Sequence, residues 1–363
     1  MKNDGLNLSQ NDVTALESRW NQKPPDSDET ALQQMIQQLK TQCKKHHIER
    51  PLALDLRGIT LFNEDLSDLD LSGYDFSYAN LNQSDLTGTI FSYSKFYKTS
   101  LEKAKLDECE FIGSDLSYAS LNECSAVQCG FGGADLSNTS IINANLSHAT
   151  LSHSKLINAD IRASNLEKAR LSEADLSGSI FTRSKLVKSD LKKSNVQDTN
   201  FELADMRECR LLGIKNFKKA KWIGTDIRDL DLRGAYLVRR YIADENYLYE
   251  FQSSSRFHKF IYLLWWASSD CGRSLLRWFV WLSIITLVFA AIYSQLNIDY
   301  GASKTFFSPI YFSVVTVTTL GYGDILPVSF IAQFIVTLQA ITGYMGLGGL
   351  LSILGNKMAR RAE

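Results

Sequence analysis

The chain repeats a five-residue unit, which reads Ala79-Asn80-Leu81-Asn82-Gln83 in one place and Ala134-Asp135-Leu136-Ser137-Asn138 in another. A large apolar residue recurs at every fifth position from Leu56 to Leu211, and Ala126 is the sole exception. A period of five fits neither the 3.6 residues of a helical turn nor the two-residue alternation of a strand. Each unit therefore contains a turn and directs its large side chain into a shared interior.

A second rule accompanies the first. The residue two positions before each large one is Ala, Ser, Thr or Cys in every unit from Ala79 to Cys209. No proline occurs between residues 52 and 308, so the backbone N–H groups of the repeat are available as donors almost everywhere. After Leu211 the register slips by one residue, and we expect the repeat to resume at Phe217, Trp222, Ile227, Leu232 and Leu237.

These units resemble the pentapeptide-repeat family, whose pattern is A-(D/N)-L-x-x. The resemblance implies a right-handed quadrilateral β-helix with four pentads in each square coil, so that residues i and i+20 stack. From residue 56 to about 240 this gives roughly nine coils and, at about 4.8 Å between adjacent strands, a rod about 43 Å long. Two interior ladders are then expected, formed by Phe91, Phe111 and Phe131 and by Ile161, Phe181 and Phe201.

Charge is unevenly distributed along the repeat. Residues 55–140 hold 14 acidic and 5 basic residues, whereas residues 141–240 hold 12 acidic and 19 basic. Two interpretations stay open: drift on a solvated surface, or attraction of the basic half to an anionic membrane leaflet. The near balance over the whole repeat argues against a DNA mimic, which needs a continuous acidic face, and we expect no nucleic-acid partner.

The whole chain has 363 residues, 45% hydrophobic residues and a formal net charge of −1. This average hides a composite, because apolar residues concentrate in the last quarter. Residues 278–296 and 328–355 carry no charge, and each stretch is long enough to cross a bilayer. The stretch 257–267 is too short, and we interpret it as a capping or interfacial helix.

Basic residues set the expected topology of these two spans. Arg273 and Arg277 precede the first span and Lys357, Arg360 and Arg361 follow the second, while the loop between the spans carries only Lys304. The positive-inside rule then places both termini, and with them the repeat, in the cytoplasm. The sequence predicts a multi-pass protein of the plasma (inner) membrane.

The loop between the spans contains Thr316-Val317-Thr318-Thr319-Leu320-Gly321-Tyr322-Gly323-Asp324. This stretch closely resembles the potassium-channel signature T-x-x-T-x-G-Y-G-D, of the two-span bacterial and inward-rectifier type. An apolar stretch before it, 308–317, is too short to span and matches a re-entrant pore helix. The resemblance implies an all-α two-span pore domain that assembles as a homotetramer with fourfold symmetry.

In that family the filter binds dehydrated K⁺ through backbone carbonyls and a threonine hydroxyl. Carried onto this chain, the ion-binding residues are Thr319, Leu320, Gly321, Tyr322 and Gly323. The two glycines allow backbone angles that an L-residue resists. The only metal implied is K⁺ in this filter, and no other cofactor is expected.

Four further residues match positions that support the filter in this family: Thr318, Asp324, Tyr311 and Phe312. The chain departs from the pattern at two positions. Leu320 replaces the commoner Val, and Val315 stands where some relatives have a Glu that pairs with the filter Asp. The sequence therefore leaves open how Asp324 is held.

Gly343 lies twenty residues after Gly323, where the gating hinge of the family falls, and Gly346 is a second candidate. Close helix packing is the competing interpretation of these glycines. Neither span carries a regular array of Arg or Lys, so we expect no voltage sensor.

The sequence predicts four segments: an N-terminal polar and helical cap, the repeat, a helical linker or cap, and the pore domain, over residues 1–50, 51–240, 241–275 and 276–363. Within the first, residues 28–43 have apolar residues at helical spacing. This helix caps the open end of the repeat, or it makes a tetramer contact or senses a ligand.

Two functions compete. The first is a K⁺-selective homotetrameric channel that its cytoplasmic repeat gates or modulates through an unknown ligand or protein partner. The second is a membrane-anchored scaffold that binds a partner through the repeat, with a non-conducting pore. No nucleophile–base or metal-ligand arrangement supports an enzyme.

Overall fold

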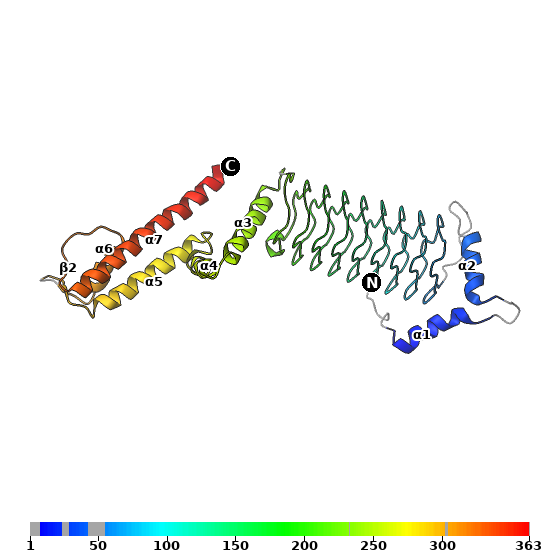
Figure 1. Ribbon diagram of the computed structural model, residues 1–363, viewed down its shortest axis with the longest axis horizontal. Coiled ribbons are helices and arrows are strands. Elements are labelled where there is room, and N and C mark those ends of the chain that lie inside the picture. The colour runs from blue at the N-terminus through cyan, green and yellow to red at the C-terminus, as the bar shows by residue number, and fades with distance from the viewer. Residues whose placement is uncertain (1–7, 24–28, 43–54, 232, 302–303, 363) are drawn as a thin grey trace. The chain divides into compact units, whose positions relative to one another are not determined.

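The computed structural model describes residues 8–23, 29–42, 55–231, 233–301 and 304–362. The chain divides into two compact units, Met1–Tyr247 and Leu248–Glu363, and the boundary falls within helix α3 (Tyr236–Ser253). The first unit is built of stacked coils and the second of helices (Figure 1).

The coils of the first unit have a period of twenty residues. Parallel bridges join each pentad to the pentad twenty residues later, from Asp55 with Asp75 to Asn195 with Lys215. The expected stacking of residues i and i+20, with four pentads in each coil, is confirmed. Figure 1 shows the resulting stack of coils in cyan and green.

The pentad Asp85–Thr89 shows why the sequence adopts this shape. Three of its N–H groups donate to carbonyls of the adjacent coils, and the N–H of Thr89 closes the turn on the carbonyl of Leu86 at 3.0 Å. The remaining N–H, of Thr87, donates to the carboxylate of Asp85 at 3.2 Å. All five donors are thus satisfied, as buried backbone requires. This accounts for the Asp or Asn of the pattern and for the lack of proline.

The interior is filled by the large side chains in ladders. The rings of Phe91 and Phe111 lie 5.0 Å apart and those of Phe111 and Phe131 lie 5.2 Å apart, so this ladder is confirmed. Phe181 and Phe201 stack at 5.3 Å in the second. Each fully buried Leu or Phe contributes about 1.5–3 kcal/mol, and the ladders therefore carry the stability of the unit.

The slip of register after Leu211 is a one-residue insertion. Asn216, at a φ of 59°, precedes a short 3₁₀ turn, η2 (Phe217–Lys219). The bridges beyond it join residues twenty-one apart, as in Asn200 with Lys221. The hydroxyl of Tyr241 on α3 donates to the carbonyl of Lys218 at 3.0 Å, so the inserted turn packs on that helix.

The prediction that the repeat continues to Leu237 is wrong. Among the described residues the last bridge is that of Arg210 with Asp231, and Leu237 lies in α3 with 72% of its surface exposed. Leu232, which was also expected to continue the repeat, lies outside the described residues. A further coil has no neighbour to pair with beyond this point, whereas a helix satisfies its own backbone. Ala235, Val238 and Ile242 are buried against the last coil.

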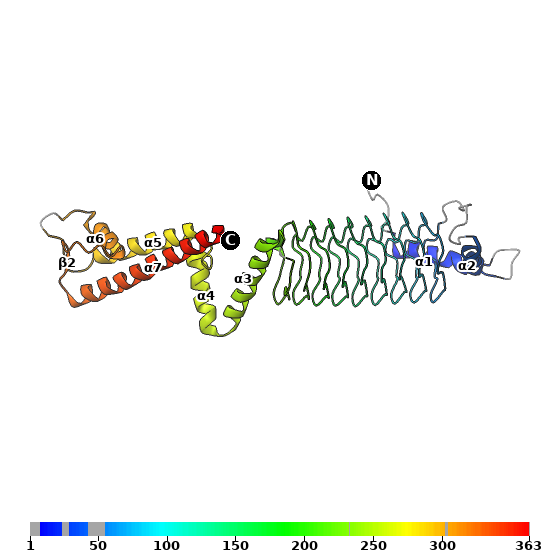
Figure 2. The same ribbon diagram turned by 90° about the horizontal axis from the view of Figure 1, so that it is seen from above.

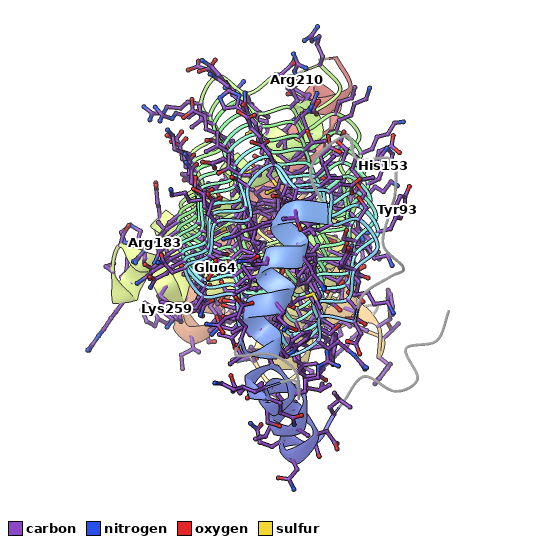
Figure 3. All side chains as sticks on the ribbon, turned by 90° about the vertical axis from the view of Figure 1, so that its right-hand side faces the viewer. Glu64, Tyr93, His153, Arg183, Arg210 and Lys259 are labelled. Atoms are coloured by element: carbon purple, nitrogen blue, oxygen red, sulfur yellow. The ribbon has the colours of Figure 1, made fainter. Side chains whose placement is uncertain are left out.

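The other end of the stack is covered by α1 (Gln10–Ser18), η1 (Arg19–Asn21) and α2 (Ala31–Gln42). Trp20 and Leu39 are buried in the same core as the first coils. The indole N–H of Trp20 donates to the carbonyl of Arg57 at 3.0 Å. Figure 3 looks onto this end, with α2 across the coils. Because an uncovered coil would expose unpaired strand groups, these contacts protect the edge.

The second unit contains α4 (Arg256–Ser269), α5 (Leu275–Tyr293), β1 (Ile298–Asp299), α6 (Ser308–Val317), β2 (Leu326–Pro327) and α7 (Phe330–Ala362). Helices α5, α6 and α7 pack on one another (Figure 2). Strand β1 pairs antiparallel with β2. Helix α5 and residues 330–355 of α7 are long and apolar enough to cross a membrane. The short apolar helix predicted at 308–317 is α6.

Candidate functional site

The segment between α6 and β2 is the candidate site, and α6 leads directly into it. Pro309 in the first turn of α6 suits a position where an N–H would lack a helical partner. The helix ends at Thr318, whose hydroxyl donates to the carbonyl of Val314 at 2.8 Å. The C-terminus of a helix carries partial negative charge, so α6 favours a cation at the start of the segment.

The backbone of this segment takes the left-handed conformation at every second residue. The φ angles are 57° at Thr319, 52° at Gly321 and 76° at Gly323. Leu320 and Tyr322, which lie between them, do not have a positive φ. Because a helix needs the same backbone angles at every residue, a segment in which the sign of φ alternates does not wind into one. Successive carbonyl groups can then face the same side of an extended strip.

The sequence did not predict the positive φ angle of Thr319. The two glycines were expected to adopt special angles, but a β-branched residue at positive φ is a rare and strained conformation. Such strain persists only where the surrounding structure imposes it. Here the N–H of Thr319 donates to the carbonyl of Thr316 at 3.1 Å and that of Leu320 to Val315 at 3.1 Å.

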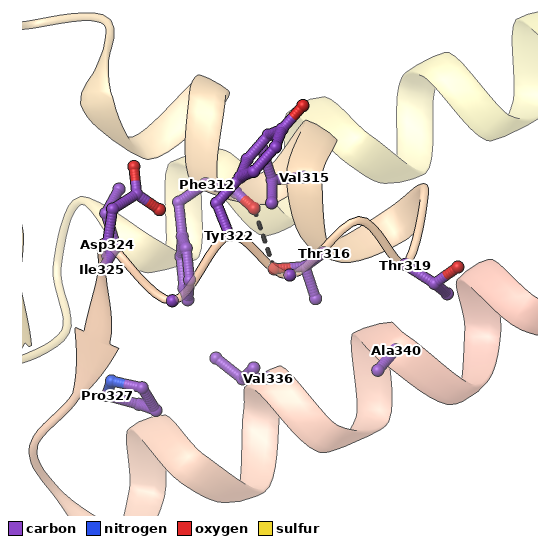
Figure 4. Close-up of a pocket in the computed structure, with 12 residues that line it drawn as sticks. Phe312, Val315, Thr316, Thr319, Tyr322, Asp324, Ile325, Pro327, Val336 and Ala340 are labelled. Atoms are coloured by element: carbon purple, nitrogen blue, oxygen red, sulfur yellow. Dashed lines mark hydrogen bonds between the residues drawn. The ribbon is translucent and has the colours of Figure 1, made fainter.

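One side of the segment is open in the single chain. Leu320 and Tyr322 expose 59% and 66% of their surfaces, although both are large and apolar or aromatic. A cavity of about 290 Å³ lies between the segment and α7, where Val336 and Ala340 face it (Figure 4). A single chain therefore presents the strip without enclosing an ion.

Asp324, at the far end of the segment, is held by α6. The hydroxyl of Tyr311 donates to a carboxylate oxygen of Asp324 at 2.9 Å. The side chain of Val315 has no polar group, so among the described residues Tyr311 takes the place of the missing glutamate. Helix α6 thus anchors the segment at both ends, through its own C-terminus and through Tyr311.

Phe312, the neighbour of Tyr311, has a different environment. Its side chain is buried and its ring lies 5.0 Å from that of Tyr293 on α5. Its backbone carbonyl accepts the hydroxyl of Thr316 at 2.8 Å, the bond drawn in Figure 4. The two aromatic residues expected to support the segment therefore face different partners.

The glycines proposed as hinge residues lie at close contacts along an unbroken α7. A Cβ at Gly343 would clash with the carbonyl oxygen of Val317 at the end of α6. A Cβ at Gly346 would lie 2.8 Å from Leu282 of α5. These close contacts favour the packing interpretation in the conformation described.

Comparison with known proteins bears on both units. Residues 281–360 match the family model described as "Ion channel". Residues 104–181 match "Pentapeptide repeat region", and residues 55–92, 65–107 and 169–208 match "Pentapeptide repeats". The chain joins a pentapeptide-repeat region to an ion-channel domain. Neither family is an enzyme family, and the two apolar helices of the ion-channel domain indicate a membrane location.

A curated relative of the ion-channel domain is the calcium-gated potassium channel TvoK of Thermoplasma volcanium. It is 36% identical over 77 residues, which are 20% of this chain and 22% of TvoK. The chain thus spans about a fifth of the length of the curated relative that it matches. The likeness makes the domain a distant homologue of a potassium channel and does not extend to the rest of TvoK.

Two solved pentapeptide-repeat structures are similar to the first unit. HetL of the cyanobacterium Nostoc sp., involved in regulation of heterocyst differentiation, is 22% identical; the match covers 47% of this chain and 90% of HetL, with a TM-score of 0.25. QnrB1, a plasmid-mediated fluoroquinolone resistance protein, is 20% identical over 53% of this chain and 98% of QnrB1, with a TM-score of 0.43. Neither likeness bears on what this chain does.

Proposed function

We propose that the chain is one subunit of a homotetrameric, K⁺-selective channel of a prokaryotic inner membrane. The observation that carries the proposal is the left-handed backbone at Thr319, Gly321 and Gly323. Carbonyl oxygens that face one side can replace the water molecules that K⁺ loses when it enters the filter. In this proposal residues 319–323 bind the ions. Four further residues hold this segment in position: Thr318, Tyr311, Phe312 and Asp324.

The open side of the segment supports the fourfold assembly. A dehydrated K⁺ needs about eight oxygen ligands, and one strip can reach an ion from one direction only. Four copies around an axis supply them and also cover the exposed Leu320 and Tyr322. Non-helical backbone at membrane depth is tolerated because it is then enclosed by protein and lines a wet pore.

The experiment that tests conduction is K⁺ flux from liposomes that contain the purified full-length tetramer. We expect K⁺ to leave the vesicles, Ba²⁺ to block that flux, and Na⁺ not to replace K⁺. Protein-free liposomes are the control for leak. A correctly assembled tetramer without flux would favour the scaffold function instead.

We further propose that both termini are cytoplasmic and that the repeat modulates the pore from that side. The excess of Arg and Lys outside the two spans supports this topology. The chain leaves the repeat through α3 and reaches the pore through α4, so any influence of the repeat must pass through these two helices or through a direct contact.

The first turns of α5 offer a route for this influence. The indole N–H of Trp281 donates to the carbonyl of Ala267 on α4 at 2.8 Å. The indole N–H of Trp278 donates to the carbonyl of Gly346 on α7 at 2.9 Å, and its ring lies against Gly349. Two tryptophans one turn apart therefore hold α5 to the linker helix α4 on one side and to α7, the inner helix that lines the proposed pore, on the other.

Trp278→Phe and Trp281→Phe keep an aromatic ring and remove only the indole N–H. Hydrogen bonds between membrane helices are worth about 1 kcal/mol, so we expect each variant to change the ratio of open to closed channels about three- to tenfold. Single-channel recording measures this ratio, and Phe279→Leu, at an exposed residue of the same turn, is the matched control. An open probability equal to that of the wild type in both tryptophan variants would contradict the proposed route.

A further inference from the structure

A polar side chain is fully buried in the first third of α7. Gln339 exposes 0% of its surface, and it lies in the stretch of α7 that is apolar enough to cross a membrane. An amide buried in such a helix is costly unless every one of its polar atoms finds a partner. The partners of Gln339 come from both of the other helices of the pore domain.

The hydrogen bonds of Gln339 fix its orientation. Its amide nitrogen donates to the carbonyl oxygen of Ser313 at 3.1 Å and to the Ser313 hydroxyl at 2.6 Å. Its amide oxygen accepts the hydroxyl of Tyr293, on α5, at 2.5 Å. A backbone carbonyl can only accept, so the nitrogen must face Ser313 and the oxygen must face Tyr293.

The hydrogen-bond network continues from Ser313 to α5. The hydroxyl of Ser313 donates to the carbonyl of Thr286 on α5 at 2.6 Å, and Ser313 itself is fully buried. The amide of Gln339 therefore joins α7 to α6 and to α5, and Ser313 joins α6 directly to α5. One subunit thus contains a closed polar connection among the three helices of its pore domain.

Ser313 occupies a particular place on α6. It lies two residues after Tyr311, which holds Asp324, and five residues before Thr318, at which α6 ends and the filter segment begins. A shift of α6 at Ser313 would move both anchors of the segment together. The contact with Gln339 is therefore placed to fix the filter relative to the inner helix.

We propose that Gln339 is a positioning residue for the filter, which holds α6 in register with α7 through Ser313 and Tyr293. This inference rests on the proposed function and adds a residue that acts on ion selectivity without touching an ion. Packing alone could hold the helices together, but directional bonds from one amide to two helices define their register as well as their distance.

Gln339→Leu tests the inference because it keeps a side chain of similar size and removes the amide. The carbonyl of Ser313 and the hydroxyl of Tyr293 then lose their partner in a dry environment. Gln339→Glu is the rescue variant, since a protonated carboxyl can donate to Ser313 and accept from Tyr293. Gln333→Leu, the same substitution at an exposed position of the same helix, is the matched control, since among the described residues the amide of Gln333 makes only a long, exposed hydrogen bond of 3.4 Å to the carbonyl of Pro327.

Two measurements are made on full-length tetramers: Ba²⁺ binding in detergent by calorimetry, and the K⁺-to-Na⁺ permeability ratio in bilayers. We expect Gln339→Leu to weaken Ba²⁺ binding and to lower the permeability ratio, each about tenfold, as the loss of one buried hydrogen-bonded group implies. Gln339→Glu should restore most of both quantities at a pH that keeps the carboxyl protonated, and Gln333→Leu should resemble the wild type.

A Gln339→Leu tetramer with wild-type Ba²⁺ affinity and selectivity would overturn the inference. If this variant does not assemble, Tyr293→Phe, which removes one bond only, takes its place, and a wild-type permeability ratio in that variant overturns the inference equally. A wild-type chain that neither conducts K⁺ nor binds Ba²⁺ would instead refute the proposed function, and the two failures are thereby distinct.

Discussion

Replacing Gly321 with alanine is expected to abolish K⁺ flux while the tetramer remains assembled. Gly321 has a φ of 52°, and in the single chain no atom beyond Gly321 and its two neighbours in the sequence lies within 4 Å of the place a Cβ would take. The substitution therefore adds no clash within the subunit and acts on the backbone. The left-handed conformation costs an alanine about 1–2 kcal/mol, which turns the neighbouring carbonyl out of the strip in all four copies at once.

The matched control for this variant is Gly348→Ala on α7. That glycine also has free space around its Cβ position, but its backbone is helical and alanine suits it. We expect flux close to the wild type from Gly348→Ala, with tetramers of both variants verified by size-exclusion chromatography with light scattering. A Gly321→Ala tetramer that still passes K⁺ selectively would contradict the assignment of the filter.

Leu136→Asp is expected to unfold the repeat. Leu136 is fully buried in the interior, where the coils before and after it pack on its side chain. The change removes about 1.5–3 kcal/mol of apolar burial and leaves an unpaired charge, which costs several kcal/mol more. Together these losses approach the whole stability of an ordinary domain, about 5–15 kcal/mol.

Circular dichroism on heating and limited proteolysis measure this effect. Each coil contacts only its neighbours, so we expect cleavage to begin in the middle of the repeat, near the altered coil. Asn138→Asp introduces the same charge into the same pentad at an exposed position and should leave the repeat intact. A Leu136→Asp repeat that melts at the wild-type temperature and resists protease would contradict the inward placement of Leu136.

The stacked coils of the repeat were predictable from the sequence, whereas the structure at the two ends of the repeat was not. The five-residue spacing predicts the stacking and the ladder from Phe91 to Phe131, because every pentad has the same pattern and therefore adopts the same local structure. Leu237 keeps the spacing, yet it lies in α3, because this helix covers the last coil with Val238 and Ile242 and leaves Leu237 exposed. Helix α1 was missed because it is short and its one clear signal is the capping box of Ser9 and Asp12.

In the site, the motif predicts the glycines and the pore helix but not the contacts between helices. The left-handed Thr319 is imposed by its surroundings against the preference of a β-branched side chain. The bond between Tyr311 and Asp324 joins residues of the motif region, whereas Gln339 meets Tyr293 from a position 46 residues away. The two glutamines of this apolar stretch, Gln333 and Gln339, are the signal that could have found it, as polar residues in spanning helices usually face a protein partner.

The central claim is that four copies of residues 319–323 select K⁺. Its most direct test is the reversal potential of the full-length channel in a planar bilayer, with K⁺ on one side and an equal concentration of Na⁺ on the other. We expect the current to reverse far from zero, at a potential of the sign that opposes K⁺ flow, and to be blocked by Ba²⁺. A reversal potential near zero in a conducting tetramer would contradict a K⁺-selective filter.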